Sequence, residues 1–111
     1  MNVALGTVGT LLVRVDGGPK PVTVVLGDFS YVPGTVTVRV GQRVRFVNRG
    51  KIGHTVADVN AKGAILGKAI RPTLLETGQS QVVTFTKPSR VAYLCTLHPT
   101  LMKGVVIVRS R

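Results

Sequence analysis

The chain alternates apolar and polar residues in short stretches that are separated by turn-forming residues. In residues 35–40 every second residue is valine, and in residues 43–48 Val44 and Phe46 alternate with arginines. A period of two is typical of a β-strand with one buried face. These two stretches predict neighbouring strands, each with one apolar and one charged face, that form half of a β-sandwich.

The same alternation, or a run of β-branched residues, recurs along the rest of the chain and predicts further strands. Residues 60–79 lack it and are broken by glycines and Pro72, so we expect a loop or a short helix over one end of the sandwich. The pattern predicts seven or eight short strands in an all-β, two-sheet antiparallel sandwich. The further strands are expected at residues 9–15, 22–26, 54–59, 80–86, 91–94 and 104–109.

Length and charge limit the interpretation. A chain of 111 residues predicts one domain, residues 1–111, that is long enough to bury a core. It contains no apolar run of about 18 residues, and residues 1–15 lack the basic start of a signal peptide, so neither a span nor a leader is expected. Fifteen Lys and Arg against four Asp and Glu give a net charge of +11. That charge predicts attraction to an acidic protein, an anionic membrane surface or nucleic acid.

The candidate chemistry lies near the end of the sequence. Cys95 is the only cysteine, and Met102 is the only methionine besides Met1. His54 and His98 are the only histidines. A thiolate, an imidazole and a weak axial thioether are ligands of a blue-copper electron-transfer site, which also needs a second imidazole. Only His54 can supply it, so the chain must fold to bring that residue to the other three.

A set of short motifs is spread over most of the chain from about residue 29 onward. A Cys-x-x-His pair alone would be weak support, but the whole set in order is specific. The set is Phe29-x-x-x-Pro33, Val40-Gly41-Gln42-x-Val44-x-Phe46-x-Asn48, His54-Thr55-Val56, Gly78-Gln79-Ser80-x-x-x-x-Phe85, Tyr93-x-Cys95-x-x-His98-Pro99, Met102 and Gly104-x-Val106-x-Val108. This set resembles that of the cupredoxins, and within them the plastocyanin, amicyanin and pseudoazurin group.

The resemblance implies an eight-stranded Greek-key sandwich with one mononuclear type 1 copper that cycles between Cu(I) and Cu(II). It implies a periplasmic or other extracytoplasmic protein that carries single electrons between larger redox proteins. By position, His54, Cys95, His98 and Met102 match the copper ligands. His54 would be the buried imidazole, and His98 would be the partly exposed one through which electrons leave.

Two positions depart from the group. Three residues separate His98 from Met102, where known loops of the group have two or four, so the axial bond is expected to be unusual. Thr55 follows the first histidine where many relatives have asparagine, and its hydroxyl is expected to replace one of the asparagine's hydrogen bonds. The residues expected to support the ligands are Asn48, Gly53, Thr55 and Pro99.

A partner surface is expected around His98. Leu97, Pro99 and Leu101, with Lys103 beside them, would form an apolar collar, unless the two leucines pack inward. The expected partner is an acidic redox protein such as a cytochrome, an oxidase or a reductase, and an anionic membrane surface is a further possibility. The protein is expected to be a monomer. The basic residues interpreted as a solvated sheet face are Arg39, Arg43, Arg45, Arg49 and Lys51.

Several alternatives remain at this point. The same ligands would serve copper storage or delivery, and a Cys-His-His site also suits zinc. An enzyme with Cys95 as nucleophile and His98 as base is disfavoured, because the two converge better on a metal and no acidic residue lies near them in the sequence. A nucleic-acid binder is disfavoured as well, because the chain has only five aromatic residues and most are expected in the core, which leaves no stacking platform.

Overall fold

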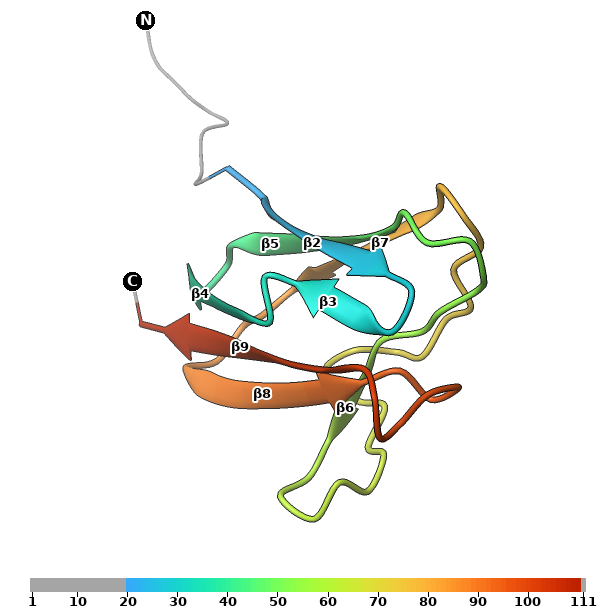
Figure 1. Ribbon diagram of the computed structural model, residues 1–111. Helices are drawn as coiled ribbons and strands as arrows, with labels where there is room; N and C mark the ends of the chain where they lie inside the picture. The colour runs from blue at the N-terminus through green and yellow to red at the C-terminus, as the bar shows by residue number, and fades with distance from the viewer. Residues whose placement is uncertain (1–19, 111) are drawn as a thin grey trace, which may run out of the picture.

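The computed structural model describes residues 20–110, in which two four-stranded sheets face each other (Figure 1). No helix among these residues has the length and apolar character needed to cross a membrane. The first sheet, in the order β3-β2-β5-β7, contains β3 (Ser30–Val32), β2 (Val22–Gly27), β5 (Arg43–Asn48) and β7 (Ser80–Thr84). The second, in the order β4-β9-β8-β6, contains β4 (Thr35–Arg39), β9 (Lys103–Arg109), β8 (Ser89–Leu94) and β6 (Ala57–Val59).

The space between the sheets is filled by the inward faces of these strands. In β4 and β9 the alternating valines are buried and the residues between them face outward. Tyr93 lies at the centre, with its ring 4.8 Å from that of Tyr31 and 5.4 Å from that of Phe46, both in edge-to-face geometry. Each such pair contributes about 0.5–1.5 kcal/mol beyond simple burial, so the aromatic residues hold the sheets together close to Cys95.

The predicted all-β sandwich is confirmed, but two pairings differ from the expected antiparallel arrangement. β4 and β5 were expected side by side and belong instead to different sheets. β4 pairs in parallel with β9, and β5 pairs in parallel with β2. Alternation shows which side chains face the core, but it does not show which strand lies next to which. Only the crossing of the chain between the sheets decides that.

Several strand boundaries also differ. The prediction of a strand at residues 54–59 is wrong in its first half, because His54 makes only an isolated bridge to Leu75 and β6 begins at Ala57. β8 begins at Ser89, two residues before the start expected at residue 91, and the short strand β3 was not predicted. Residues 60–79 contain no helix and form a loop. The strand expected at residues 9–15 lies outside the described residues.

Two buried tyrosines give a matched test of this core. The hydroxyl of Tyr31 donates to the carbonyl oxygen of Thr55 at 2.7 Å, whereas the buried hydroxyl of Tyr93 has no hydrogen-bond partner among the described residues. Losing a satisfied hydrogen bond costs about 0.5–1.5 kcal/mol, while removing an unsatisfied group costs little or is favourable. We therefore expect Tyr31→Phe to lower the free energy of unfolding and Tyr93→Phe to leave it unchanged or raise it. Urea unfolding of the metal-free variants measures both, and equal losses would contradict the assignment.

Candidate metal centre

Three loops meet at one end of the sandwich, and the loop between β8 and β9 carries most of the candidate ligands. Cys95 directly follows β8, and its N–H donates to the carbonyl oxygen of Met102 at 3.1 Å. The N–H of His98 donates to the carbonyl oxygen of Cys95 at 3.1 Å, and the N–H of Met102 donates to the carbonyl oxygen of His98 at 3.0 Å. These bonds fold residues 95–102 into a compact loop whose first and last residues are joined.

The structure brings His54, Cys95 and His98 together. The Sγ atom of Cys95 lies 3.9 Å from Nδ1 of His54 and 3.7 Å from Nδ1 of His98, and the ligand atoms of the three residues all lie within 4.8 Å of one another. Metal bonds from such donors are about 2.0–2.3 Å long, so three donors around one ion stand about 4 Å apart. The three residues therefore fit a single metal ion.

Burial differs among the candidates as the resemblance implies. His54 and Cys95 are fully buried, and His98 is half-buried. Met102 is fully buried as well, and its side chain belongs to the same core cluster as Cys95. The site is therefore closed toward the core and reached by solvent beside His98.

Thr55 places two hydrogen-bond donors, its N–H and its hydroxyl, next to the sulfur of Cys95. Its N–H donates to Sγ at 3.4 Å and its hydroxyl lies 3.8 Å from Sγ. The same hydroxyl oxygen accepts from the N–H of Thr96 at 2.8 Å. Burial raises the pKa of the Cys95 thiol, but hydrogen bonds to the sulfur, including those from the N–H groups of Thr55 and Leu97, outweigh burial and bring the pKa to about 6. The residue is thus a thiolate, the form that binds metals, at neutral pH.

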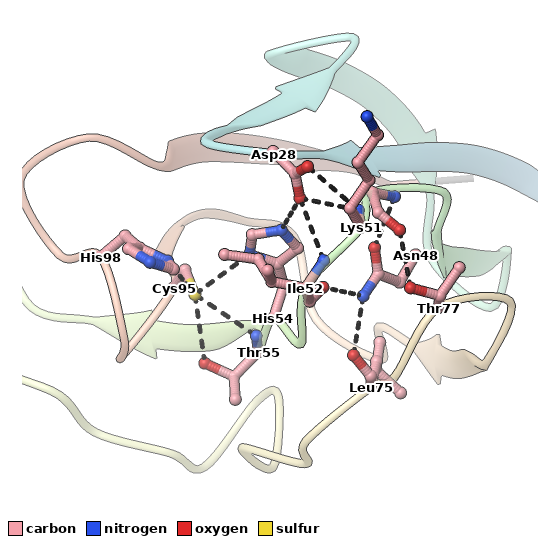
Figure 2. A network of polar contacts seen from close by, with 11 residues as sticks. Asp28, Asn48, Lys51, Ile52, His54, Thr55, Leu75, Thr77, Cys95 and His98 are labelled. Atoms are coloured by element: carbon pink, nitrogen blue, oxygen red, sulfur yellow. Dashed lines mark hydrogen bonds and ion pairs between the residues drawn. The ribbon is translucent and has the colours of Figure 1, made fainter.

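An acidic residue reaches the site from a turn that is distant from His54 in the sequence. Oδ1 of Asp28, between β2 and β3, lies 2.9 Å from Nε2 of His54 (Figure 2). The carboxylate also accepts the N–H of Lys51 at 3.0 Å to each oxygen, and the N–H of Ile52 at 3.4 Å. These bonds, first that from His54 and then that from Lys51, hold the pKa of Asp28 below its usual value. Asp28 is 26 residues from His54, and nothing in its local sequence marks it.

Asn48 fixes the loop that carries His54. Its buried side-chain amide donates to the carbonyl oxygens of Ile52 and Leu75, both at 2.8 Å, and its side-chain oxygen accepts the N–H of Gly50 at 2.8 Å (Figure 2). His54 and Leu75 exchange two backbone hydrogen bonds of 3.0 and 2.8 Å. The backbone on both sides of the imidazole is therefore held in place.

The surface around His98 is apolar. Leu97 and Leu101 are 55% and 65% exposed, so inward packing of these leucines is excluded, and Pro99 and Lys103 are exposed as well. Phe29, which was not expected here, is 47% exposed and its ring stands edge-on to that of His98 at 4.8 Å. An exposed aromatic ring therefore joins the predicted collar beside the half-buried imidazole.

Gly53 directly precedes His54 in the loop that follows β5. Gly53 is half-buried, and a Cβ atom added there would lie 2.8 Å from Oε1 of Glu76, so the side chains of the neighbouring loop cover this position closely. The basic residues of β4 and β5 face outward but lie on different sheets, so they do not form one face as expected.

A sequence model of copper binding proteins of the plastocyanin/azurin family matches residues 20–109. The chain belongs to this family. Two amicyanins are among the proteins that this chain resembles. The amicyanin of Paracoccus versutus is 33% identical over 87 residues and that of Paracoccus denitrificans 31% over 88 residues. In both cases 78% of this chain is aligned, and it spans only 64% of the length of the relative.

Solved structures of the family agree. The reduced form of a mutant amicyanin superimposes with a TM-score of 0.70 at 26% identity, covering 85% of this chain and 87% of that one. A purple cupredoxin from Nitrosopumilus maritimus gives a TM-score of 0.73 at 20% identity, covering 78% and 98%, which supports the fold. The chain is thus a cupredoxin, and its metal is copper rather than zinc.

Proposed function

We propose that this cupredoxin carries single electrons between redox proteins, with one type 1 copper held by His54, Cys95 and His98 and by Met102 as axial ligand. The observation that supports this most strongly is the meeting of three ligand atoms within 4.8 Å at one end of the sandwich. Two imidazoles and a thiolate with a weak axial thioether are the ligand set of electron-transfer copper sites. The family also supports the expectation that the protein is not an enzyme.

The surrounding residues explain why such a site transfers electrons readily. Copper, when bound, supplies a couple between Cu(I) and Cu(II). Asn48 and Asp28 hold the loop and ring of His54, and Thr55 holds the sulfur of Cys95. Because the donors are fixed by bonds that do not involve the metal, little has to move when the charge changes. Burial of Cys95 excludes water from the sulfur, and half-buried His98 gives electrons a short route to the surface.

The partner surface is proposed to be the apolar collar of Leu97, Pro99 and Leu101, extended by Phe29. Exposed leucines and an exposed aromatic side chain are typical of interaction sites when they gather in one patch. The net charge of +11 makes an acidic redox protein the proposed partner, since opposite charge accelerates encounter. We propose further that the protein acts as a monomer in an extracytoplasmic compartment.

Copper loading tests the function directly. We expect an intense visible absorption from thiolate-to-copper charge transfer and a reversible one-electron couple in voltammetry. Rapid loss of copper to a weak chelator, without a reversible couple, would support storage or delivery instead. A colourless oxidised protein would contradict the proposal.

The charge around the collar gives a kinetic prediction. Lys103 borders the ligand loop at the start of β9, whereas Lys87 precedes β8 at the far end of the sandwich. At about 0.1 M salt the Debye length is about 10 Å, which is shorter than the roughly 20 Å length of a six-residue strand. We expect Lys103→Gln to slow oxidation of the reduced protein by hexacyanoferrate(III), an anion, about twofold or more, and Lys87→Gln to leave the rate unchanged. Stopped-flow absorbance measures both, and equal effects would contradict electron exit beside His98.

A further inference from the structure

The turn between β2 and β3 contacts the histidine loop through one carboxylate. Asp28 joins this turn to residues 51–54 by accepting two backbone N–H groups and contacting Nε2 of His54 (Figure 2). Gly50 leaves the room for this approach, because a Cβ atom added there would lie 3.0 Å from Cγ of Asp28. The carboxylate is therefore held in place from two directions and is not a freely rotating surface group.

The contact determines which nitrogen of His54 carries the proton. An ionised carboxylate only accepts hydrogen bonds, so Nε2, at 2.9 Å from Oδ1, carries a proton. In the neutral form of the ring the lone pair is then on Nδ1, the atom that faces Sγ of Cys95 at 3.9 Å. The ring is thus in the tautomer required of a ligand before any metal arrives.

The contact also places a negative charge next to the site. The side chain of Asp28 is 30% exposed and lies within ion-pair distance of the fully buried ring of His54. A carboxylate that contacts a ligand ring favours the metal state of higher charge, here Cu(II) over Cu(I). The chain has a net charge of +11, and the carboxylate of Asp28 partly compensates that positive charge at the metal site.

We propose that Asp28 is a positioning residue for His54 that selects the ligating tautomer and, through its charge, lowers the reduction potential of the copper site. This inference rests on the proposed function for the potential and stands independently of it for the tautomer. Carboxylate partners of ligating histidines commonly raise metal affinity and orient the ring.

The tautomer is tested on metal-free protein. Two-dimensional 1H–15N spectra of the histidine rings, recorded at mildly alkaline pH, are expected to show His54 protonated at Nε2 in the wild type. The Asp28→Asn variant, whose amide oxygen still accepts a hydrogen bond, keeps that tautomer. Asp28→Ala is expected to give a mixture of the two. A neutral wild-type ring protonated at Nδ1, or an unchanged Asp28→Ala spectrum, would overturn the proposal that Asp28 selects the tautomer of His54.

The charge is tested on copper-loaded protein by voltammetry. Asp28→Asn is expected to shift the preference for Cu(I) over Cu(II) about tenfold, which equals about +59 mV for a one-electron couple. Asp28→Ala is expected to weaken Cu(II) binding by about 10–100-fold as well. The matched control is Glu76→Gln, which removes one negative charge close to Gly53. Among the described residues, the carboxylate of Glu76 forms no hydrogen bond or ion pair with a candidate ligand, unlike that of Asp28, so this variant should shift the potential much less.

A purely structural role would lower thermal stability in both Asp28 variants without moving the potential, and that result would overturn the inference. Equal shifts of the reduction potential in Asp28→Asn and Glu76→Gln would also overturn the inference. If the wild type itself lacks a reversible couple, the proposed function fails, and the metal-free spectra still decide the role of Asp28.

Discussion

Replacing Cys95 with serine is expected to remove the visible colour of the copper-loaded protein. The absorption requires a thiolate bonded to copper, and a serine hydroxyl remains protonated at neutral pH. The thiol of Cys95 is the only one in the chain, so no other residue can replace it. We expect the band to fall by more than about tenfold at equal copper content, because the thiolate is the ligand form of cysteine. Visible spectra with parallel copper analysis measure the change.

The control for this variant is Met102→Leu, which keeps the two imidazoles and the thiolate and replaces only the proposed axial thioether. Its band is expected to persist, while its reduction potential changes. The N–H of buried Cys95 donates to the backbone carbonyl oxygen of Met102. Neither substitution changes these backbone atoms, so both variants retain the hydrogen bond that closes the loop. A Cys95→Ser protein that stays coloured would rule out the proposed ligand set.

Gly104→Ala is expected to destabilise the fold strongly. Gly104 pairs with Tyr93 across β8 and β9, and a Cβ atom at this glycine would lie 2.5 Å from Cζ and 2.6 Å from the hydroxyl oxygen of Tyr93. The ring of Tyr93 is 1% exposed and packed against Tyr31 and Phe46, so it cannot move aside. Overpacking of this kind costs about 1–3 kcal/mol and occasionally more. Urea unfolding of the metal-free protein measures the loss.

Gly34→Ala provides the comparison, because a Cβ atom there meets nothing closer than the carbonyl oxygen of Tyr31 at 3.9 Å. Gly34 is exposed and lies beside the same strand, since its carbonyl oxygen accepts the N–H of Val105. We expect a change within about 0.5 kcal/mol for this surface substitution. If Gly104→Ala unfolds at the same urea concentration as Gly34→Ala, the ring of Tyr93 does not pack over Gly104 as described.

The sequence predicts which face of each strand is buried better than it predicts which strands pair with each other. The valines of β4 and Val44 and Phe46 of β5 face the core as their alternation indicates, because burial of one face selects that pattern directly. The assignment of β4 and β5 to one sheet failed, since a tight turn between two strands favours a hairpin only when nothing else competes. Here β9 and β2, distant in sequence, provide the pairing partners.

The candidate ligands could be found because they are rare. With one cysteine and two histidines, few combinations were possible, and the structure places these three side chains together. Asp28 and Phe29 were missed because their roles arise from the turn between β2 and β3 folding over the histidine loop. The turn has an unusual backbone, since Phe29 has φ of 71°, a left-handed conformation that is rare for a bulky residue. This conformation cannot be recognised from the sequence.

The parallel pairing of β4 with β9 has a practical consequence. It places Arg109 beside Arg39, while the opposite end of β9 begins at Lys103, next to the ligand loop. In Figure 1 the C-terminal end of β9 accordingly points away from that loop. A tether attached at this end would immobilise the molecule on an electrode or a resin with its redox face directed toward solution, separated from the support by about the 20 Å length of the strand.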